Sequence, residues 1–220
     1  MYKLKSFPGG SHTIIAQILR EIKAKTFLDV GSSNGFIGLC LNYKPNILWA
    51  VDKVKVRLPG NYSNFTRANV ETTSWTFLRS TKFDAIVLAD ILEHLKRPKQ
   101  VIKKLKPFLA QNGCFIISVP NMDFWLVSLF KFFGMRPKMD KGLFDSTHRH
   151  DFNHKLLAVL LEENFLKKDS ITYTPPPLPL ISKWFDKGEI LYPVHRLVFY
   201  LANRFPVPFA YQIIVKVKPI

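Results

Sequence analysis

Apolar and polar positions divide most of the chain into short strand-like runs and longer amphipathic segments. Four mostly apolar runs have the length of strands: residues 27–30, 47–51, 83–89 and 112–121. Runs of this kind are typical of strands that are buried on both faces of a parallel sheet. Residues 11–23 carry apolar side chains three and four positions apart, which predicts an amphipathic helix with Ser11 as its N-cap. The alternation predicts an α/β fold.

Further segments complete the predicted sheet and its helices. Strand patterns cover residues 65–71, 168–174 and 208–219, and helical patterns cover residues 98–109 and those that follow Asn153. Pro59 and Gly60 interrupt the polar stretch before residue 65, which indicates a loop. The proline-rich residues 175–180 predict a stiff extended segment.

Two segments are unusually apolar for helices at the surface. Residues 124–133 are apolar on nearly every side, yet a helix of that length is only about 15 Å long and cannot cross a bilayer. Residues 188–204 form a second apolar pattern, which Pro193 starts or kinks. We expect both to belong to helical insertions, near residues 122–145 and 180–206.

The length and composition bound the fold and the compartment. A chain of 220 residues that is 47% apolar can bury one substantial core, so we expect a single domain over residues 1–220. Uninterrupted apolar runs of 18 residues are absent from the sequence, which predicts a cytoplasmic protein without a spanning helix. Cys40 and Cys114 have no metal-ligand spacing, so we interpret them as core residues and expect no metal site.

The charge of the chain points to an anionic partner. Lysine and arginine number 32 against 16 acidic residues, which gives a net charge of +16. Such a charge favours encounter with phosphate groups, an anionic membrane or nucleic acid, without choosing among them. The densest run of basic residues, from Lys96 to Lys106, is typical of a solvated helix face.

A glycine-rich turn follows the first strand and carries the candidate chemistry. Gly31 and Gly35 allow backbone conformations that other residues rarely adopt, and the segment that follows presents free N–H groups to a ligand. The next strand ends in Asp52, at the position where Rossmann-type sites place the carboxylate that binds ribose hydroxyls. The pair predicts a nucleotide site.

These residues resemble the class I S-adenosylmethionine-dependent methyltransferases. In that family Asp-x-Gly-x-Gly-x-Gly closes the first strand, and here the residues from Asp29 to Gly35 match it, with Ser33 in place of the middle glycine. Residues 83–95, which end in Leu-Glu-His-Leu, resemble the family's fourth strand, and residues 112–121 resemble its fifth. The resemblance implies a Rossmann-like seven-stranded sheet, mostly parallel with an antiparallel last strand, and S-adenosylmethionine as the cofactor.

The resemblance also implies the residues of the cofactor site. They are Asp29, Gly31, Ser33, Gly35, Asp52, Asn69, Val70 and Asp90. Asn69 replaces the usual aspartate of the adenine-binding stretch, and its amide can still exchange hydrogen bonds with the base. Asp90 ends the fourth strand and should face the cofactor or the substrate, because open α/β sheets bind ligands at the carboxyl ends of their strands.

The acceptor half resembles methyltransferases that are encoded with glycan and lipid-linked sugar enzymes. The resemblance rests on the His-x-His-x-Phe block from His148 to Phe152, which in those proteins forms part of the acceptor pocket. It implies His148 as the proton acceptor for a hydroxyl, with His150 or Asp90 as other catalytic candidates. Arg149 and Asn121 are the candidate substrate-binding residues.

We therefore expect O-methylation of a small glycan- or lipid-linked acceptor. Two alternatives stay open: RNA methylation, for which the net charge is the main support, and a pseudoenzyme that binds S-adenosylmethionine or a partner. The strand ending Ala89-Asp90-Ile91-Leu92 lacks the Pro-Pro-aromatic sequence of amino-directed nucleic-acid enzymes. The two apolar helices with their basic neighbours also predict peripheral contact with the inner face of an anionic membrane. The oligomeric state is left open.

Overall fold

The structure is a computed structural model that describes residues 4–55, 58, 61–140 and 142–220. Its centre is a sheet of seven strands: β1 Thr26–Val30, β2 Ile47–Asp52, β3 Asn64–Arg67, β4 Phe83–Ala89, β5 Leu109–Pro120, β6 Leu166–Thr174 and β7 Gln212–Pro219. The spatial order is β3-β2-β1-β4-β5-β7-β6, and the first five strands in that order pair in parallel. Strand β7 is antiparallel to both of its neighbours, β5 and β6. This topology confirms the Rossmann-like sheet that the sequence predicts.

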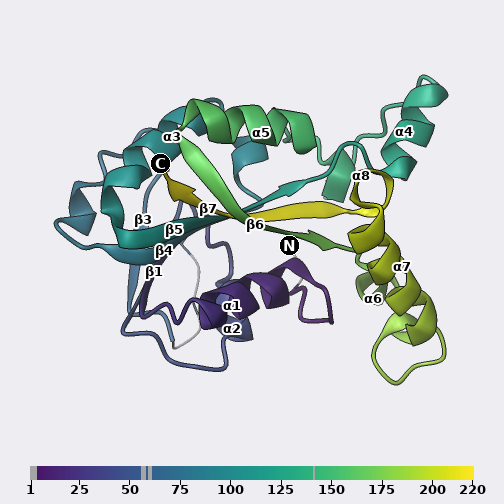
Figure 1. The fold of residues 1–220 in the computed structure, drawn as a ribbon, viewed down its shortest axis with the longest axis horizontal. Coiled ribbons are helices and arrows are strands. Elements are labelled where there is room, and N and C mark those ends of the chain that lie inside the picture. The colour runs from purple at the N-terminus through teal and green to yellow at the C-terminus, as the bar shows by residue number, and fades with distance from the viewer. Residues whose placement is uncertain (1–3, 56–57, 59–60, 141) are drawn as a thin grey trace.

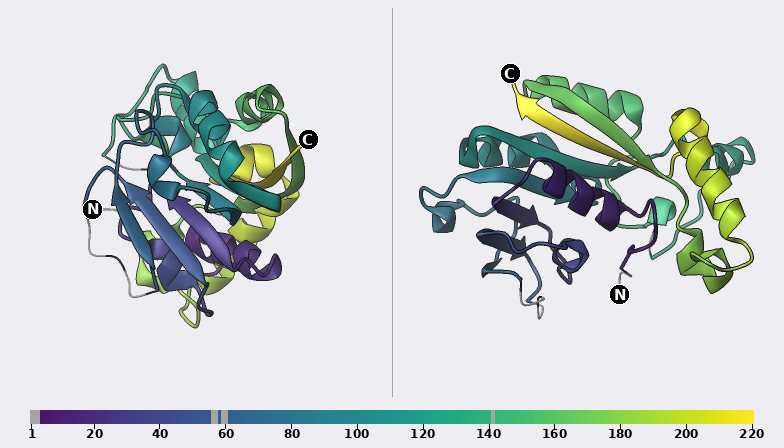
Figure 2. Two further views of the ribbon diagram at one scale, coloured as in Figure 1. Left: turned by 90° about the vertical axis from the view of Figure 1, so that its left-hand side faces the viewer. Right: turned by 60° about the horizontal axis from the view of Figure 1, so that its bottom comes forward.

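Helices cover both faces of the sheet (Figures 1 and 2). On one face lie α1 Ser11–Glu21 and the short α2 Phe36–Cys40, and on the other lie α3 Pro98–Leu105 and α5 His154–Glu163. Strand residues alternate between the two apolar cores: Ile86 and Leu88 of β4 pack with α3 and α5, whereas Ala85 and Val87 pack with α1. The alternation follows from the two-residue period of a strand.

The remaining helices gather beyond the end of the sheet at which β7 begins (Figure 1). They are α4 Trp125–Phe132, α6 Leu178–Ile181, α7 Tyr192–Arg204 and α8 Pro206–Phe209. Short 3₁₀ helices connect the larger elements: η1 Thr76–Leu78, η2 Leu92–His94, η3 Lys106–Phe108, η4 Gly142–Phe144 and η5 Lys183–Phe185. Pro193 lies in the first turn of α7, one residue after the helix begins at Tyr192. Among the described residues, every helix is too short or too polar to cross a bilayer.

Several predicted boundaries are wrong for identifiable reasons. Gly10, not Ser11, is the N-cap of α1, and the buried Ser11 hydroxyl bonds to no described residue. Strand β5 begins at Leu109, so the turn expected at residues 111–113 lies within the strand. The pairing of β5 with β4 is irregular there, and a Cβ on Gly113 would lie 2.7 Å from a backbone oxygen of β4. In addition, part of the expected extended segment 175–180 is helical, because α6 begins at Leu178.

Other boundary predictions are confirmed, too long, or fall outside the described residues. Asn153 caps α5 by accepting a hydrogen bond from the Leu156 N–H at 2.9 Å. Strand β3 is shorter than the predicted 65–71, because the chain turns at Asn69 after Arg67. Pro59 and Gly60, which suggested a loop, lie outside the described residues.

Candidate functional site

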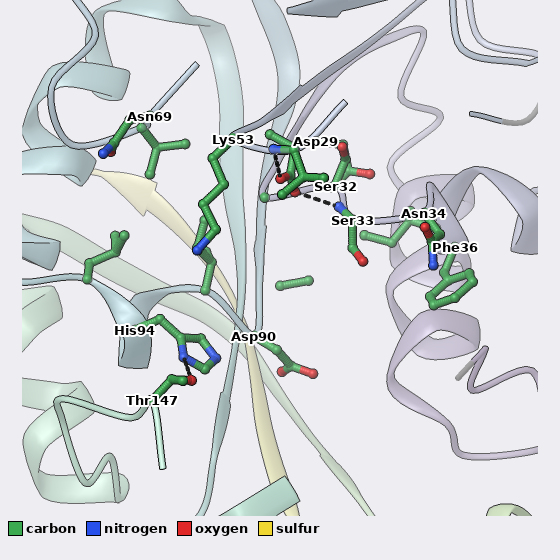
Figure 3. Close-up of a pocket in the computed structure, with 18 of the residues that line it drawn as sticks. Asp29, Ser32, Ser33, Asn34, Phe36, Lys53, Asn69, Asp90, His94 and Thr147 are labelled. Carbon is green, nitrogen blue, oxygen red and sulfur yellow. Dashed lines mark hydrogen bonds between the residues drawn. The ribbon is translucent and has the colours of Figure 1, made fainter. Parts of the chain in front are cut away.

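A cavity of about 820 Å³ opens at the carboxyl ends of β1, β2 and β4. Figure 3 shows Ser33 and Asn34 on one side of it, His94 and Thr147 on another, and Asp90 between them. The predicted residues Asp29, Gly31, Ser33, Asp52, Asn69, Val70, Asp90 and Arg149 all line it, and Gly35 lies in the adjoining turn. The sheet thus brings the predicted cofactor residues together from separate strands.

The turn after β1 has a backbone that approaches the cavity closely. Gly31 and Gly35 have φ angles of 75° and 69°, and a Cβ on Gly31 would lie 2.4 Å from the Ile91 side chain. Ser33, which stands where the family has glycine, adopts the same left-handed region with a φ of 47°. The serine therefore keeps the conformation of the turn. Because it has a side chain, it adds about 1–2 kcal/mol of backbone strain that a glycine would not have.

Asp52 fixes this turn from the end of β2. Its Oδ2 accepts a hydrogen bond from the Ser33 N–H at 2.8 Å, and its Oδ1 accepts one from the Val54 N–H at 2.9 Å. A carboxylate has about four acceptor positions, so two remain for the hydroxyls of a ribose. Asn69 uses its Oδ1 to accept the Glu71 N–H at 3.0 Å, which leaves its amide hydrogens as the donors to a base.

Asp29 lies beneath the turn in the protein interior. Its side chain is buried and accepts a short hydrogen bond from the Tyr62 hydroxyl. Burial raises the pKa of Asp29 to about 7. The hydrogen bond from Tyr62 lowers the pKa, but by less than burial raises it. Asp29 is therefore a buried residue of the cavity wall whose side chain is held by Tyr62.

Asp90 is held as an anion by three side chains. Its Oδ2 lies 3.0 Å from Lys5 Nζ, Gln212 Nε2 donates to both of its oxygens at 2.7 Å, and Ser118 donates a short hydrogen bond. Burial raises the pKa of Asp90, but Lys5 and the Ser118 hydrogen bond outweigh it and bring the pKa to about 2. An ionised carboxylate with these partners is a poor proton carrier, so the predicted catalytic role for Asp90 is disfavoured.

Lys5 and His12 are cavity residues that the sequence analysis does not name. The His12 Nδ1 accepts a hydrogen bond from the Lys5 backbone N–H at 3.0 Å, and both side chains line the cavity. Burial, reinforced by the Lys5 ammonium, lowers the pKa of His12 to about 4. Neutral His12 therefore carries its hydrogen on Nε2 and is a donor. Neither residue lies in a sequence motif, because both reach the site from the segment before and at the start of α1.

His94 and His148 lie side by side at the other end of the cavity. Their ring centroids are 4.8 Å apart, but only His94 is among the described residues that line the cavity. His94 Nδ1 lies 2.9 Å from Thr147 Oγ1, which in turn donates to Asp145 Oδ1 at 2.6 Å. Burial lowers the pKa of both imidazoles, and it raises the pKa of the neighbouring Glu93 carboxyl well above its usual range.

Two predicted acceptor residues have structural partners instead. The fully buried Asn121 donates to the carbonyls of Pro206, Val207 and Ala210, so its amide is committed to holding α8 on β5. His150 Nε2 lies 3.0 Å from the Leu95 carbonyl oxygen. Neither is among the described residues that line the cavity, so the structure does not support substrate binding by Asn121 or catalysis by His150.

Comparison with known families decides the identity of this site. The family model for a methyltransferase domain matches residues 11–168, which is most of the chain and includes every residue of the glycine turn. The chain belongs to the methyltransferase domain family. The seven-stranded sheet is the Rossmann-like methyltransferase fold, and family and fold together support S-adenosylmethionine as the cofactor.

Solved structures share the fold at low sequence identity. A SAM-dependent methyltransferase from Archaeoglobus fulgidus has a TM-score of 0.55 and 18% identity, over 95% of each chain. The magnesium protoporphyrin IX methyltransferase of Synechocystis PCC 6803, with bound SAH, has a TM-score of 0.60 and 13% identity, over 96% of this chain and 82% of that one. A putative O-methyltransferase from Nostoc punctiforme has a TM-score of 0.57 and 15% identity, over 94% of this chain and 55% of that one. This chain therefore spans about half the length of that protein. Among curated proteins, none matches.

The cavity residues fit this cofactor. The left-handed turn from Gly31 to Gly35 leaves no side chain between its backbone and the cavity at the two glycines, and Asp52 has acceptor positions left for the ribose. Asn69 and Val70 also line the cavity, and Figure 3 shows Asn69 on the opposite side from Ser33. When bound, S-adenosylmethionine supplies an activated methyl group on a sulfonium ion.

Proposed function

We propose that this methyltransferase transfers a methyl group to a hydroxyl oxygen of a small glycan- or lipid-linked acceptor. The observation that carries the proposal is the division of the cavity into two chemically different ends. One end has the glycine turn, Asp52 and Asn69, which suit the cofactor. The other has His94, Thr147 and Arg149, which the cofactor does not need.

The size of the cavity supports a second ligand beside the cofactor. Its volume of about 820 Å³ is near the upper end of the range of about 300–1,000 Å³ for ligand pockets. Methyl transfer demands little of the protein beyond aligning the acceptor with the donor methyl group and excluding water. An acceptor between Asp90 and Arg149 would meet the methyl group at the centre of the cavity.

The polar groups at the acceptor end suit hydroxyl and phosphate groups. Arg149 has a planar guanidinium that binds phosphate oxygens in pairs, and its exposed position lets it reach a headgroup. The Thr147 hydroxyl, whose hydrogen goes to Asp145, can also accept a hydrogen bond from a sugar hydroxyl, whereas neutral His12 lies beside Phe36 on the side of the glycine turn. Arg149 is the group that favours a negative charge on the acceptor, and that charge would have to lie apart from the Asp140 and Asp145 carboxylates, which also line the cavity.

The apolar helices favour an acceptor with a lipid portion. Phe132 of α4, Ile181 of α6 and Ile190 before α7 are 83%, 75% and 81% exposed, at the end of the sheet that bears the cavity. Basic side chains accompany them: Lys131, Arg136, Lys138, Lys183, Arg196 and Arg204. Lys141, which the sequence adds to this set, lies outside the described residues. Apolar residues with a basic edge suit the surface of an anionic membrane, where lipid-linked acceptors reside.

Transfer of labelled methyl groups tests the proposal. The purified protein is incubated with methyl-labelled S-adenosylmethionine and separate lipid, glycan and RNA fractions of the source cells. We expect label in the lipid or glycan fraction that survives mild alkali, as a methyl ether does and a methyl ester does not. Label confined to RNA would support RNA methylation instead, and cofactor binding without label in any fraction would support a pseudoenzyme.

A matched pair of variants ties that activity to the proposed acceptor end. Arg149→Gln should raise the KM for the acceptor at least about tenfold, which is what loss of one charge-assisted hydrogen bond costs. Its affinity for the cofactor should stay unchanged. Arg20→Gln, on the exposed side of α1, is the control. An unchanged KM in Arg149→Gln would remove this residue from the acceptor site.

A further inference from the structure

Three potential metal ligands meet at the acceptor end of the cavity. Glu93 and His94 end the 3₁₀ helix η2, and His148 comes from a loop 54 residues further on. One carboxylate oxygen and one ring nitrogen from each histidine all lie within 4.8 Å of one another. The segments are tied by hydrogen bonds from the Arg149 and His150 N–H groups to the Glu93 carbonyl, at 2.7 and 3.2 Å. The cluster is thus held by the fold.

Glu93 has a buried oxygen that no described residue satisfies. Its side chain is only 2% exposed, and its Oε2 has no hydrogen-bond partner in the described part of the chain. A buried polar group without a partner costs about 1–3 kcal/mol, and a buried charged group costs more. A bound cation would remove that cost at this position.

His94 is oriented as metal-ligating histidines are. Thr147 donates its hydroxyl hydrogen to Asp145, so at the 2.9 Å contact it accepts the hydrogen of His94 Nδ1. The lone pair of neutral His94 is therefore on Nε2, which Figure 3 shows on the side of the ring away from Thr147. A hydrogen bond from the other ring nitrogen to an oxygen is the usual way in which proteins fix a ligand imidazole.

We propose that Glu93, His94 and His148 bind a divalent transition-metal ion. Two imidazoles and one carboxylate suit Mn²⁺, Fe²⁺, Co²⁺ or Zn²⁺ and leave coordination positions open. Ligand bonds of about 2.0–2.2 Å place adjacent ligand atoms about 3 Å apart, so atoms that now lie within 4.8 Å of one another would move together by up to about 1.8 Å on binding the ion. Through His94 the open positions would face the cavity. The sequence analysis expected no metal because the cysteines have no metal-ligand spacing. The site proposed here uses no cysteine.

Metal titration of the purified protein tests this inference without any acceptor or cofactor. After dialysis against a chelator, Co²⁺ or Zn²⁺ is added and followed by calorimetry and, for Co²⁺, by its visible absorption. We expect one equivalent to bind, with affinity reduced at least about tenfold in Glu93→Gln and in His148→Gln. The control is His154→Gln, at the start of α5 outside the cluster, which should bind like the wild type.

Thermal unfolding keeps the test interpretable if a variant is destabilised. The ion should raise the Tm of the wild type and of His154→Gln but not of Glu93→Gln, because a ligand stabilises the state that binds it. A wild type that binds no ion would overturn the inference, as would equal affinity in all four proteins. Neither result would bear on methyl transfer, so failure here and failure of the proposed function are separable.

Discussion

Asp29 places a carboxyl group in the interior beneath the glycine turn, and its raised pKa makes the stability of the fold depend on pH. Below about pH 4 the group is protonated in the folded and the unfolded chain. Between there and its folded pKa of about 7, only the unfolded chain ionises, so the free energy of unfolding falls as pH rises. The span of about 3 pKa units corresponds to at most about 4 kcal/mol.

Asp29→Asn removes this contribution, since an amide does not titrate. We predict that the variant becomes more stable relative to the wild type by about 2.7 kcal/mol when the pH rises from 5 to 8, because about 2 of the 3 pKa units lie above pH 5. Urea unfolding of both proteins without cofactor measures the difference at each pH. If the difference between the two proteins is the same at pH 5 and pH 8, the pKa of Asp29 is not raised.

Residue types and spacing were enough to predict the cofactor end of the site, but they predicted only part of the acceptor end. Gly31, Gly35 and Asp52 lie next to strand ends that the sequence itself marks, and they line or adjoin the cavity as expected. His12 reaches the cavity only because α1 packs on the sheet, and no local pattern announces it. Asn121 looked like a binding residue because sequence cannot reveal that three carbonyls occupy its amide.

At the scale of elements, Asn121 connects the core sheet to α8. Its Nδ2 lies 2.8 Å from the Ala210 carbonyl oxygen and 2.9 Å from that of Val207, in a fully buried setting. We predict that Asn121→Ala lowers the free energy of unfolding by about 2 kcal/mol, because it leaves buried carbonyls without donors. Its affinity for S-adenosylmethionine should stay within about twofold. Denaturant unfolding and calorimetry measure the two quantities, and the reverse pattern would restore a binding role to Asn121.

Element positions followed from the sequence more closely than their ends did. The apolar runs located β1, β2, β4 and β5, because burial on both faces requires apolar side chains at successive positions, and weaker strand patterns located the other three strands. The start of β5 was missed, since Asn112 and Gly113 are typical of a turn and only the pairing with β4 places them within a strand. Similarly, α6 was not predicted, because prolines fit the first turn of a helix as well as an extended segment.

At the scale of the whole molecule, the net charge of +16 and the exposed apolar helices together predict salt-sensitive binding to anionic vesicles. Each basic side chain near such a surface contributes about 1 kcal/mol, and that contribution is screened by salt. We predict sedimentation with anionic but not neutral vesicles at low salt, with most of the binding lost near 0.5 M salt, roughly where the Debye length falls toward 3 Å.

Variants at the two ends of the sheet locate that contact. Phe132→Glu on α4 should weaken vesicle binding, whereas Phe165→Glu, an exposed aromatic next to the start of β6 at the opposite end, should not. Equal sedimentation with neutral and anionic vesicles would contradict the electrostatic part of the account. Equal binding of the two variants would move the contact away from the helices.

The most direct test of the central claim, that this cavity binds S-adenosylmethionine through Asp52, is calorimetric titration of the cofactor into three proteins. The wild type and Asp169→Ala, an exposed carboxylate on β6, should bind it with equal affinity. Asp52→Ala should bind it about 30-fold more weakly or worse, since the loss of charge-assisted hydrogen bonds costs about 2 kcal/mol. No binding by the wild type, or unchanged affinity in a folded Asp52→Ala protein, would contradict the account.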